Sequence, residues 1–214
     1  MSVEPPSPIR LVFLLSGSGT TLQNLLDHID DGHVDARVEL VISSDPDAQG
    51  IVRAEKHGIP TEVVRPDAHE TSDEFSRAIS THIDDVDPDL ICMGGFMHFY
   101  TVPERYRFKV INIHPSLLPK HGGEGYYGRH VHEAVLDAGD QETGCSVHFV
   151  TNEGYDEGPV IKQKTVPVES GDTPETLEQR VKEKERELYP ETVQLFAEGR
   201  VNVQNGTVTV DDPS

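Results

Sequence analysis

Short apolar runs rich in β-branched residues alternate along this chain with segments whose leucines recur at helical spacing. The first run, at residues 10–15, leads into a helical pattern at residues 21–29 in which Leu22, Leu25 and Leu26 share one face. Continuous apolar strands separated by helices are typical of a mainly parallel sheet that helices cover on both faces. The sequence therefore predicts an α/β, Rossmann-like fold.

The rest of the chain extends this pattern. Strands are predicted at residues 38–43, 61–64, 90–94, 110–113, 146–150 and 160–166, and helices at 50–57, 72–83 and 131–138. Thr173 can cap a last long helix, which has Pro174 at its first position and continues to about residue 197.

A chain of 214 residues is long enough to bury a full core as a single domain. Asn205 and Gly206 join two short valine-rich runs and predict a terminal hairpin. We therefore expect a flexible N-terminus at residues 1–9, one domain at 10–203, and the hairpin end and tail at 204–214.

The segment after the predicted strand at 110–113 cannot continue regular structure. It contains two prolines and four glycines, namely Pro115, Pro119, Gly122, Gly123, Gly125 and Gly128. A long loop is predicted there, and loops of that length usually carry function.

The net charge argues against two classes of partner. With 38 acidic against 18 basic residues spread along the chain, the formal charge is −20. Such a surface repels phosphates, so we expect neither a nucleic acid nor an anionic membrane as a partner. It is typical of halophilic proteins from a salt-loaded cytoplasm, where ions screen the repulsion. An ordinary acidic enzyme is the alternative interpretation.

The cysteines and the apolar runs indicate the compartment. Cys92 and Cys145 lie within apolar runs, which favours buried free thiols in a reducing interior over a disulfide. Every apolar run is far shorter than the roughly 20 residues that span a bilayer. The N-terminus MSVEPPSP has neither the basic start nor the apolar core of an export signal. We expect a cytoplasmic protein.

A glycine-containing turn follows the first predicted strand. The run Ser16-Gly17-Ser18-Gly19-Thr20-Thr21 leads into a helix start, where backbone amides and the helix dipole favour an anion. A phosphate site is one interpretation and a tight strand-to-helix turn is the other. The turn lacks the third glycine of the dinucleotide fingerprint, although Asp45 lies near where a ribose-binding acid would.

Asn112 and His114 are two residues apart at the end of a predicted strand, so their side chains project to the same side. They lie at the carboxyl edge, where open α/β sheets bind ligands. An amide and a protonated imidazole there could stabilise an oxyanion. Asp156, in a loop between two strands, could raise the proton affinity of the imidazole. The structural alternatives are a strand-end histidine satisfied by backbone and a turn aspartate that caps its own backbone.

Histidines and one glutamate offer further chemistry. Five histidines fall within one third of the chain: His114, His121, His130, His132 and His148. Zinc is conceivable, but His130 and His132 would face different sides of a helix, so we predict no metal. Glu185 falls on the apolar stripe of the last helix, where it either reaches solvent or binds a ligand hydroxyl or amine.

Six segments, taken in order, carry a resemblance: SGSGTTLQNLL (16–26), GGFM (94–97), INIHPSLLPK (111–120), SVHFV (146–150), DEGPVI (156–161) and ELYP (187–190). Together they resemble the glycinamide ribonucleotide formyltransferases, a branch of the folate-dependent formyltransferase family, over about residues 10–203. The run from Asn112 to Pro119 is the most specific piece. Methionyl-tRNA formyltransferases and formyltetrahydrofolate hydrolases look similar but usually vary the residues after the histidine.

The resemblance implies transfer of a formyl group from 10-formyltetrahydrofolate, a co-substrate, to the amine of glycinamide ribonucleotide in purine biosynthesis, without a permanently bound cofactor. The catalytic residues that it implies are Asn112, His114 and Asp156. The implied ribonucleotide-binding residues are Gly19, Thr20, Thr21, Lys182, Glu183, Lys184 and Glu185. The implied folate-binding residues are Met97, His98, Phe99, Tyr100, Asn112, Thr151, Asn152, Glu153, Gly154, Tyr155 and Asp156.

The chain departs from this family at three positions and in two loops. Thr21 stands where family members usually have asparagine, which changes a phosphate contact. His98 and Ser72 stand where an arginine is often found, which changes the contacts to folate. The loop after Lys120 is longer than the usual form, and so is the loop that holds Asp156.

Two further functions stay open beside formyl transfer. One is hydrolysis of the same folate, with water in place of the amine. The other is a nicotinamide-dinucleotide-binding regulatory or redox domain built on the glycine turn and Asp45. The sequence does not indicate an oligomeric state.

Overall fold

The computed structural model describes residues 8–212, so residues 1–7 of the predicted N-terminal segment lie outside the described part. The strands are β1 (Ile9–Leu15), β2 (Ala36–Ser43), β3 (Thr61–Val63), β4 (Leu90–Met93), β5 (Val110–His114), β6 (Glu142–Phe149), β7 (Val160–Pro167), β8 (Val201–Gln204) and β9 (Thr207–Val210). The helices are α1 (Thr20–Asp30), α2 (Gln49–Lys56), α3 (Ser72–Val86), α4 (Arg129–Ala138) and α5 (Pro174–Ala197), with short 3-10 turns η1 (Pro66–Ala68) and η2 (Glu104–Tyr106).

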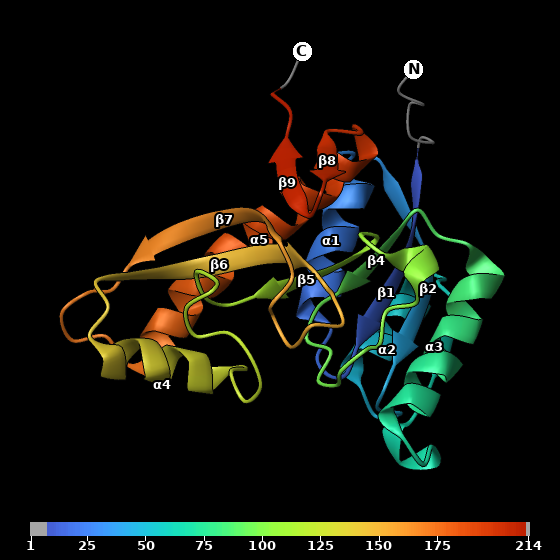
Figure 1. Ribbon diagram of the computed structural model, residues 1–214, viewed down its shortest axis with the longest axis horizontal. Helices are drawn as coiled ribbons and strands as arrows, with labels where there is room; N and C mark the ends of the chain where they lie inside the picture. Colours follow the sequence, from blue (N-terminus) through green and yellow to red (C-terminus); the bar gives the residue numbers. More distant parts are fainter. Residues whose placement is uncertain (1–7, 213–214) are drawn as a thin grey trace.

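A seven-stranded sheet in the order β3-β2-β1-β4-β5-β6-β7 forms the centre of the protein (Figure 1). Strands β1 to β5 pair in parallel, whereas β6 and β7 pair antiparallel. The prediction of a mainly parallel sheet with helices, a long C-terminal helix and a terminal hairpin is confirmed. Within residues 8–212 no helix is long and apolar enough to cross a membrane.

Alternate residues of β1 belong to two separate apolar clusters. Leu11, Phe13 and Leu15 belong to the cluster that includes residues of α1, α2 and α5, whereas Val12 and Leu14 belong to the cluster that includes residues of α3. Because both faces of the strand are covered, it reads as one continuous apolar run. Burying each of these side chains contributes about 2 kcal/mol before entropy is counted. Both cysteines are free and buried, as predicted.

The long helix α5 contacts α1 and the carboxyl end of β4. A capping box at Thr173 begins it. Pro190 lies inside the helix and has no N–H for the Arg186 carbonyl one turn earlier. That carbonyl instead accepts the side-chain amide of Asn24 in α1 at 2.8 Å. The hydroxyl of Tyr189 donates to the carbonyl of Met93, the last residue of β4, at 2.9 Å.

Strand β6 begins at Glu142, four residues before the predicted start. It pairs with β7 from Glu142 to His148, and Gly144 lies opposite Thr165. A Cβ at Gly144 would overlap the backbone carbonyl of Lys164, so this position requires a glycine. Glycine normally argues against a strand, and the sequence prediction therefore began too late.

Candidate active site

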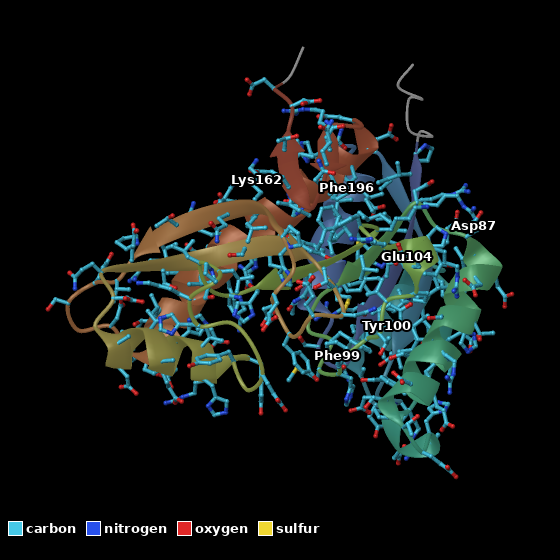
Figure 2. All side chains as sticks on the ribbon, in the orientation of Figure 1. Asp87, Phe99, Tyr100, Glu104, Lys162 and Phe196 are labelled. Atoms are coloured by element: carbon cyan, nitrogen blue, oxygen red, sulfur yellow. The ribbon has the colours of Figure 1, made fainter. Side chains whose placement is uncertain are left out.

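A cavity of about 660 Å³ opens at the carboxyl edge of the sheet. Its wall comes from the start of α1, the segment after β4, the end of β5, residues 123–128, residues 154–156 and one face of α5. This is the edge at which open α/β sheets bind ligands. Phe99 and Tyr100, both labelled in Figure 2, line the cavity from the segment after β4.

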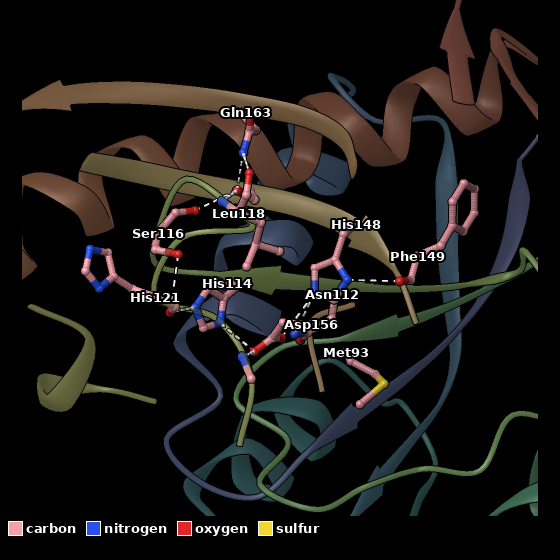
Figure 3. A network of polar contacts seen from close by, with 12 residues as sticks. Met93, Asn112, His114, Ser116, Leu118, His121, His148, Phe149, Asp156 and Gln163 are labelled. Carbon is pink, nitrogen blue, oxygen red and sulfur yellow. Dashed lines mark hydrogen bonds and ion pairs between the residues drawn. The ribbon is translucent and has the colours of Figure 1, made fainter. Parts of the chain in front are cut away.

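Asn112 and His114 both line this cavity from the end of β5, as their spacing in the strand predicts. The antiparallel pairing of β5 with β6 places His148 opposite Asn112. The Asn112 Nδ2 and His148 Nε2 atoms lie 3.3 Å apart. His148 Nδ1 donates to its neighbour's carbonyl, that of Phe149, at 2.9 Å, which fixes the ring (Figure 3).

Asp156 meets two histidines at the centre of the network in Figure 3. Its Oδ2 lies 3.2 Å from His114 Nδ1, and its Oδ1 lies 3.3 Å from His148 Nε2. The Gly123 N–H donates to Oδ2 at 3.1 Å, and the His121 carbonyl accepts from His114 Nε2 at 2.8 Å. The three side chains expected to be catalytic, Asn112, His114 and Asp156, thus surround one end of the cavity.

Burial and contacts oppose each other in setting the charges of this pair. Burial lowers the pKa of His114, and the Asp156 charge and the His121 carbonyl, which favour the proton, do not overcome it. Burial alone would raise the pKa of Asp156, but His148, His114 and the Gly123 N–H outweigh it and hold the pKa below its usual range. The carboxylate is therefore ionised at neutral pH beside an imidazole that releases its proton readily.

The segment after β4 forms an aromatic wall of the cavity. Met97, His98, Phe99 and Tyr100 line it together with Gly154 and Tyr155 from the Asp156 loop. The rings of Phe99 and Tyr155 meet edge to face, with centroids 5.2 Å apart. His98 packs against Phe75 and Phe96, and burial lowers the pKa of its imidazole. It therefore offers no permanent positive charge.

Three of the residues expected at the folate do not line the cavity, namely Thr151, Asn152 and Glu153. Asn152 has a different contact. Its side-chain amide accepts the Val102 N–H at 2.7 Å and donates to the Val102 carbonyl at 3.0 Å. This pair of bonds holds the Asp156 loop against the segment after β4.

The other end of the cavity lies between α1 and α5. Thr20, Thr21, Lys182 and Glu185 line it, as the resemblance implies. Gly19 caps α1 in a left-handed conformation, without a side-chain cap, and its backbone packs against Gly50 of α2. Three of the expected residues, Gly19, Glu183 and Lys184, do not line the cavity. Lys184 instead pairs with Glu187 at 2.9 Å.

Residues that sequence reasoning missed also line this end, notably Ser18, Asn24, His132, Glu178 and Arg186. Three turns of α5 contribute Glu178, Lys182 and Arg186, which recur every four residues. Residues four apart share one face of a helix, so the sequence could have predicted that these three side chains lie together. Burial raises the pKa of the Glu185 carboxyl to about 7, so it can donate as well as accept a hydrogen bond near neutral pH.

Two other sequence hypotheses find less support in the geometry. Asp45 does not line the cavity, and its carboxylate accepts the Asp47 N–H at 2.9 Å. The dinucleotide interpretation thus lacks its ribose-binding acid. His130 is exposed and His132 buried, as expected for opposite sides of a helix. Among residues 8–212, no three His, Cys, Asp or Glu side chains are grouped so as to hold a metal ion.

Comparisons with known proteins agree with this architecture. The family model described as formyl transferase matches residues 9–193. Phosphoribosylglycinamide formyltransferase of Escherichia coli (strain K12) is 37% identical over 205 residues, 95% of this chain and 94% of that protein. The crystal structure of glycinamide ribonucleotide transformylase 1 from Symbiobacterium toebii has a TM-score of 0.88 and 39% identity, covering 95% of this chain and 94% of that one.

A longer relative is also similar. The trifunctional purine biosynthetic protein adenosine-3 of Bos taurus is 40% identical over 206 residues, 95% of this chain. The chain spans only 20% of that protein's length, so the match concerns one part of it. The family match over residues 9–193 and the extended similarities establish that this chain belongs to the formyl transferase family.

Proposed function

We propose that this chain is a phosphoribosylglycinamide formyltransferase, which transfers the formyl group of 10-formyltetrahydrofolate to the amine of glycinamide ribonucleotide in purine biosynthesis. The observation that carries the proposal is one cavity with two differently equipped ends. Asn112, His114 and Asp156 surround one end, and the α1 N-terminus and Glu185 lie at the other. Both substrates are small molecules, and the formyl donor is consumed as a co-substrate, so no permanently bound cofactor is required.

Asn112 and His114 are assigned to the oxyanion. The amine attacks the formyl carbon, and the electron pair of the C=O bond moves onto oxygen. The Asn112 amide stabilises that negative charge by a hydrogen bond, and a protonated His114 stabilises it by its positive charge, a contribution of about 3 kcal/mol for each group. Burial makes the ring reluctant to hold a proton in the resting site, whereas a developing oxyanion favours it.

Asp156 is assigned to the proton balance. Its ionised carboxylate, 3.2 Å from His114 Nδ1, supports positive charge on the ring. The attacking nitrogen becomes cationic and must lose a proton, which a carboxylate or water beside it can accept. The electron pair of the oxyanion then re-forms the C=O bond, and the bond from the formyl carbon to N10 of the folate breaks. N10 leaves with the electron pair of that bond and takes up the proton that the amine released.

The other end suits a phosphorylated acceptor. Backbone N–H groups at the start of α1 and the positive end of its dipole favour the phosphate, with Thr20 and Thr21 supplying hydroxyls. Glu185, at the same end, suits ribose hydroxyls because it can donate or accept. An acceptor anchored at both ends brings its amine to the formyl carbon.

The requirement for the acceptor tests this function. Enzyme mixed with 10-formyltetrahydrofolate alone should leave the folate intact, and adding glycinamide ribonucleotide should start the loss of folate and the formation of formylated ribonucleotide. Rapid loss of the formyl group without the ribonucleotide, unchanged by its addition, would identify a formyltetrahydrofolate hydrolase instead.

Glu185→Ala separates the two substrate sites in the same assay. The KM for the ribonucleotide should rise by about 10-fold or more, the effect of losing a hydrogen bond to a carboxylate. Folate binding should change little. Equally weakened binding of both substrates would contradict the assignment of Glu185 to the acceptor.

A further inference from the structure

The backbone of residues 121–123 contacts both members of the His114–Asp156 pair (Figure 3). The His121 carbonyl accepts from His114 Nε2 at 2.8 Å, and the Gly123 N–H donates to Asp156 Oδ2 at 3.1 Å. The carbonyl stabilises a positive ring and the N–H stabilises a negative carboxylate. Both contacts therefore favour the same charge state, an imidazolium beside a carboxylate.

These contacts also determine which proton on His114 can move. A carbonyl only accepts, so Nε2 must carry its hydrogen whatever the charge of the ring. The proton that comes and goes is on Nδ1, which faces Asp156 Oδ2 at 3.2 Å. The position of the His121 carbonyl thus sets both the orientation and the tautomer of the ring.

The His121 side chain anchors this segment. Its Nε2 lies 2.8 Å from Oδ2 of Asp140, which follows α4, and Lys120 Nζ contacts the other oxygen of that carboxylate at 3.0 Å. His121 itself has a φ of 51°, in the left-handed region that a residue with a Cβ rarely adopts without support. The loop then continues through left-handed Gly123, Gly125 and Gly128. Glycines there cannot restrain the backbone as a side-chain contact does.

We propose that His121 is a positioning residue, whose side-chain contact with Asp140 holds residues 121–123 so that their backbone keeps His114 and Asp156 aligned as a charged pair. The proposal concerns the site of the proposed function and rests on that function for its role in catalysis.

Other titratable groups face His114 from the surrounding elements. Asp156 favours a proton on the ring, whereas positive charge on His148 of β6 or on His121 disfavours it. His132 of α4 interacts electrostatically with His114, and positive charge on one ring disfavours it on the other. A test must therefore compare variants that leave Asp156, His148 and His132 in place.

His121→Leu and His121→Gln form a matched pair for this test. Both place a side chain of similar size at the left-handed position, but only glutamine can still donate to Asp140. The titration of the His114 ring, followed by NMR without substrate, should move to lower pH by about one unit in His121→Leu, the effect of one hydrogen bond to a charged group. The alkaline limb of turnover should move by the same amount. His121→Gln should restore most of the shift.

Two further single variants and one double variant complete the design. Lys120→Gln removes the exposed partner of Asp140 and should leave both the titration and the turnover profile unchanged. Asp140→Ala removes the same anchor while keeping histidine at the left-handed position, and should reproduce the His121→Leu shift. The double variant Asp140→Ala with His121→Leu should shift no further, because one contact is lost in all three proteins.

A folded Asp140→Ala protein whose His114 titrates as in the wild type overturns the proposal, even if His121→Leu does not fold. A turnover that falls equally at every pH in both His121→Leu and Asp140→Ala overturns it too, because that outcome indicates only a structural role. The NMR titration needs no substrate, whereas formylation by the wild type tests the proposed function, so the two failures are distinguishable.

Discussion

At the scale of single residues, burial opposes charge at His114, Asp156 and Glu185. Burial lowers the pKa of His114 and raises the pKa of Glu185 to about 7, so it favours the uncharged form of both groups. Asp156 keeps its charge because two histidines and the Gly123 N–H face it. A carboxylate beside an imidazole that readily changes protonation can respond to charge that develops on a substrate.

Asn112→Ala and His114→Ala should each cost about 3 kcal/mol of transition-state stabilisation, because the first removes a donor to the oxyanion and the second removes a positive charge beside it. The double variant should cost much less than the sum, since both act on one oxygen. The values of kcat/KM for the four proteins form the cycle, and melting temperatures check folding. A folded His114→Ala protein with near-normal turnover would contradict the mechanism.

Asp156→Asn should move the alkaline limb of turnover to lower pH. The Asp156 charge raises the pKa of His114, so removing it lowers that pKa further, and a reaction that needs the protonated ring is lost at a lower pH. The KM for the ribonucleotide should stay nearly constant. The pH dependence of kcat measures the shift, and an unmoved profile would show that Asp156 does not act through the ring.

At the scale of elements, the site depends on the close approach of β6 to its neighbours. Glycines make that approach possible where a Cβ would overlap a backbone carbonyl, as at Gly144 against Lys164 and at Gly158 against Phe149. Gly158 ends the loop that carries Asp156 and precedes β7. The position of Asp156 is therefore set by the pairing of β6 and β7 as much as by the loop itself.

Gly158→Ala should destabilise the protein by about 2 kcal/mol or more, because backbone must move to relieve the overlap. Gly17→Ala is the matched control, since a Cβ there meets nothing within 4 Å and its φ is not in the left-handed region. It should change the free energy of unfolding by about 0.5 kcal/mol or less. Urea denaturation of the three proteins measures both values, and equal stability would contradict the packing described here.

At the scale of the whole molecule, negative charge is in excess. Most lysine and arginine side chains already form ion pairs, such as those of Arg180 with Asp172 and Lys164 with Glu191. With 38 acidic against 18 basic residues, many carboxylates have no cation to pair with. Their mutual repulsion opposes the compact state, and dissolved ions reduce it.

The melting temperature should therefore rise from dilute buffer to molar potassium chloride, because the Debye length falls to about 3 Å at 1 M salt. Calorimetry or circular dichroism at several salt concentrations measures the change, with a neutral osmolyte as the control for general exclusion from the surface. A melting temperature that stays flat or falls would indicate an ordinary acidic enzyme and leave the catalytic proposals unaffected.

Local spacing was enough to determine much of this protein. The alternation of continuous apolar runs with helical periods indicates an α/β fold, because both periods are properties of a few neighbouring residues. The same reasoning places Asn112 and His114 on one side at the end of β5. The roles of Asp156 and of the ribonucleotide-binding residues came instead from resemblance, since a polar loop and a helix stripe are each compatible with several functions.

Only the tertiary structure decided which distant residues meet. His148 faces Asn112 because β5 and β6 pair antiparallel in one register, and register depends on the packing of the whole sheet and not on either strand alone. Glu185 acquires its raised pKa when α5 packs beside α1 and removes the carboxyl from water. The contacts of residues 121–123 with His114 and Asp156 join two loops, and neither loop sequence encodes the distance between them. Long-range burial and pairing produce these features, so they do not follow from local sequence patterns.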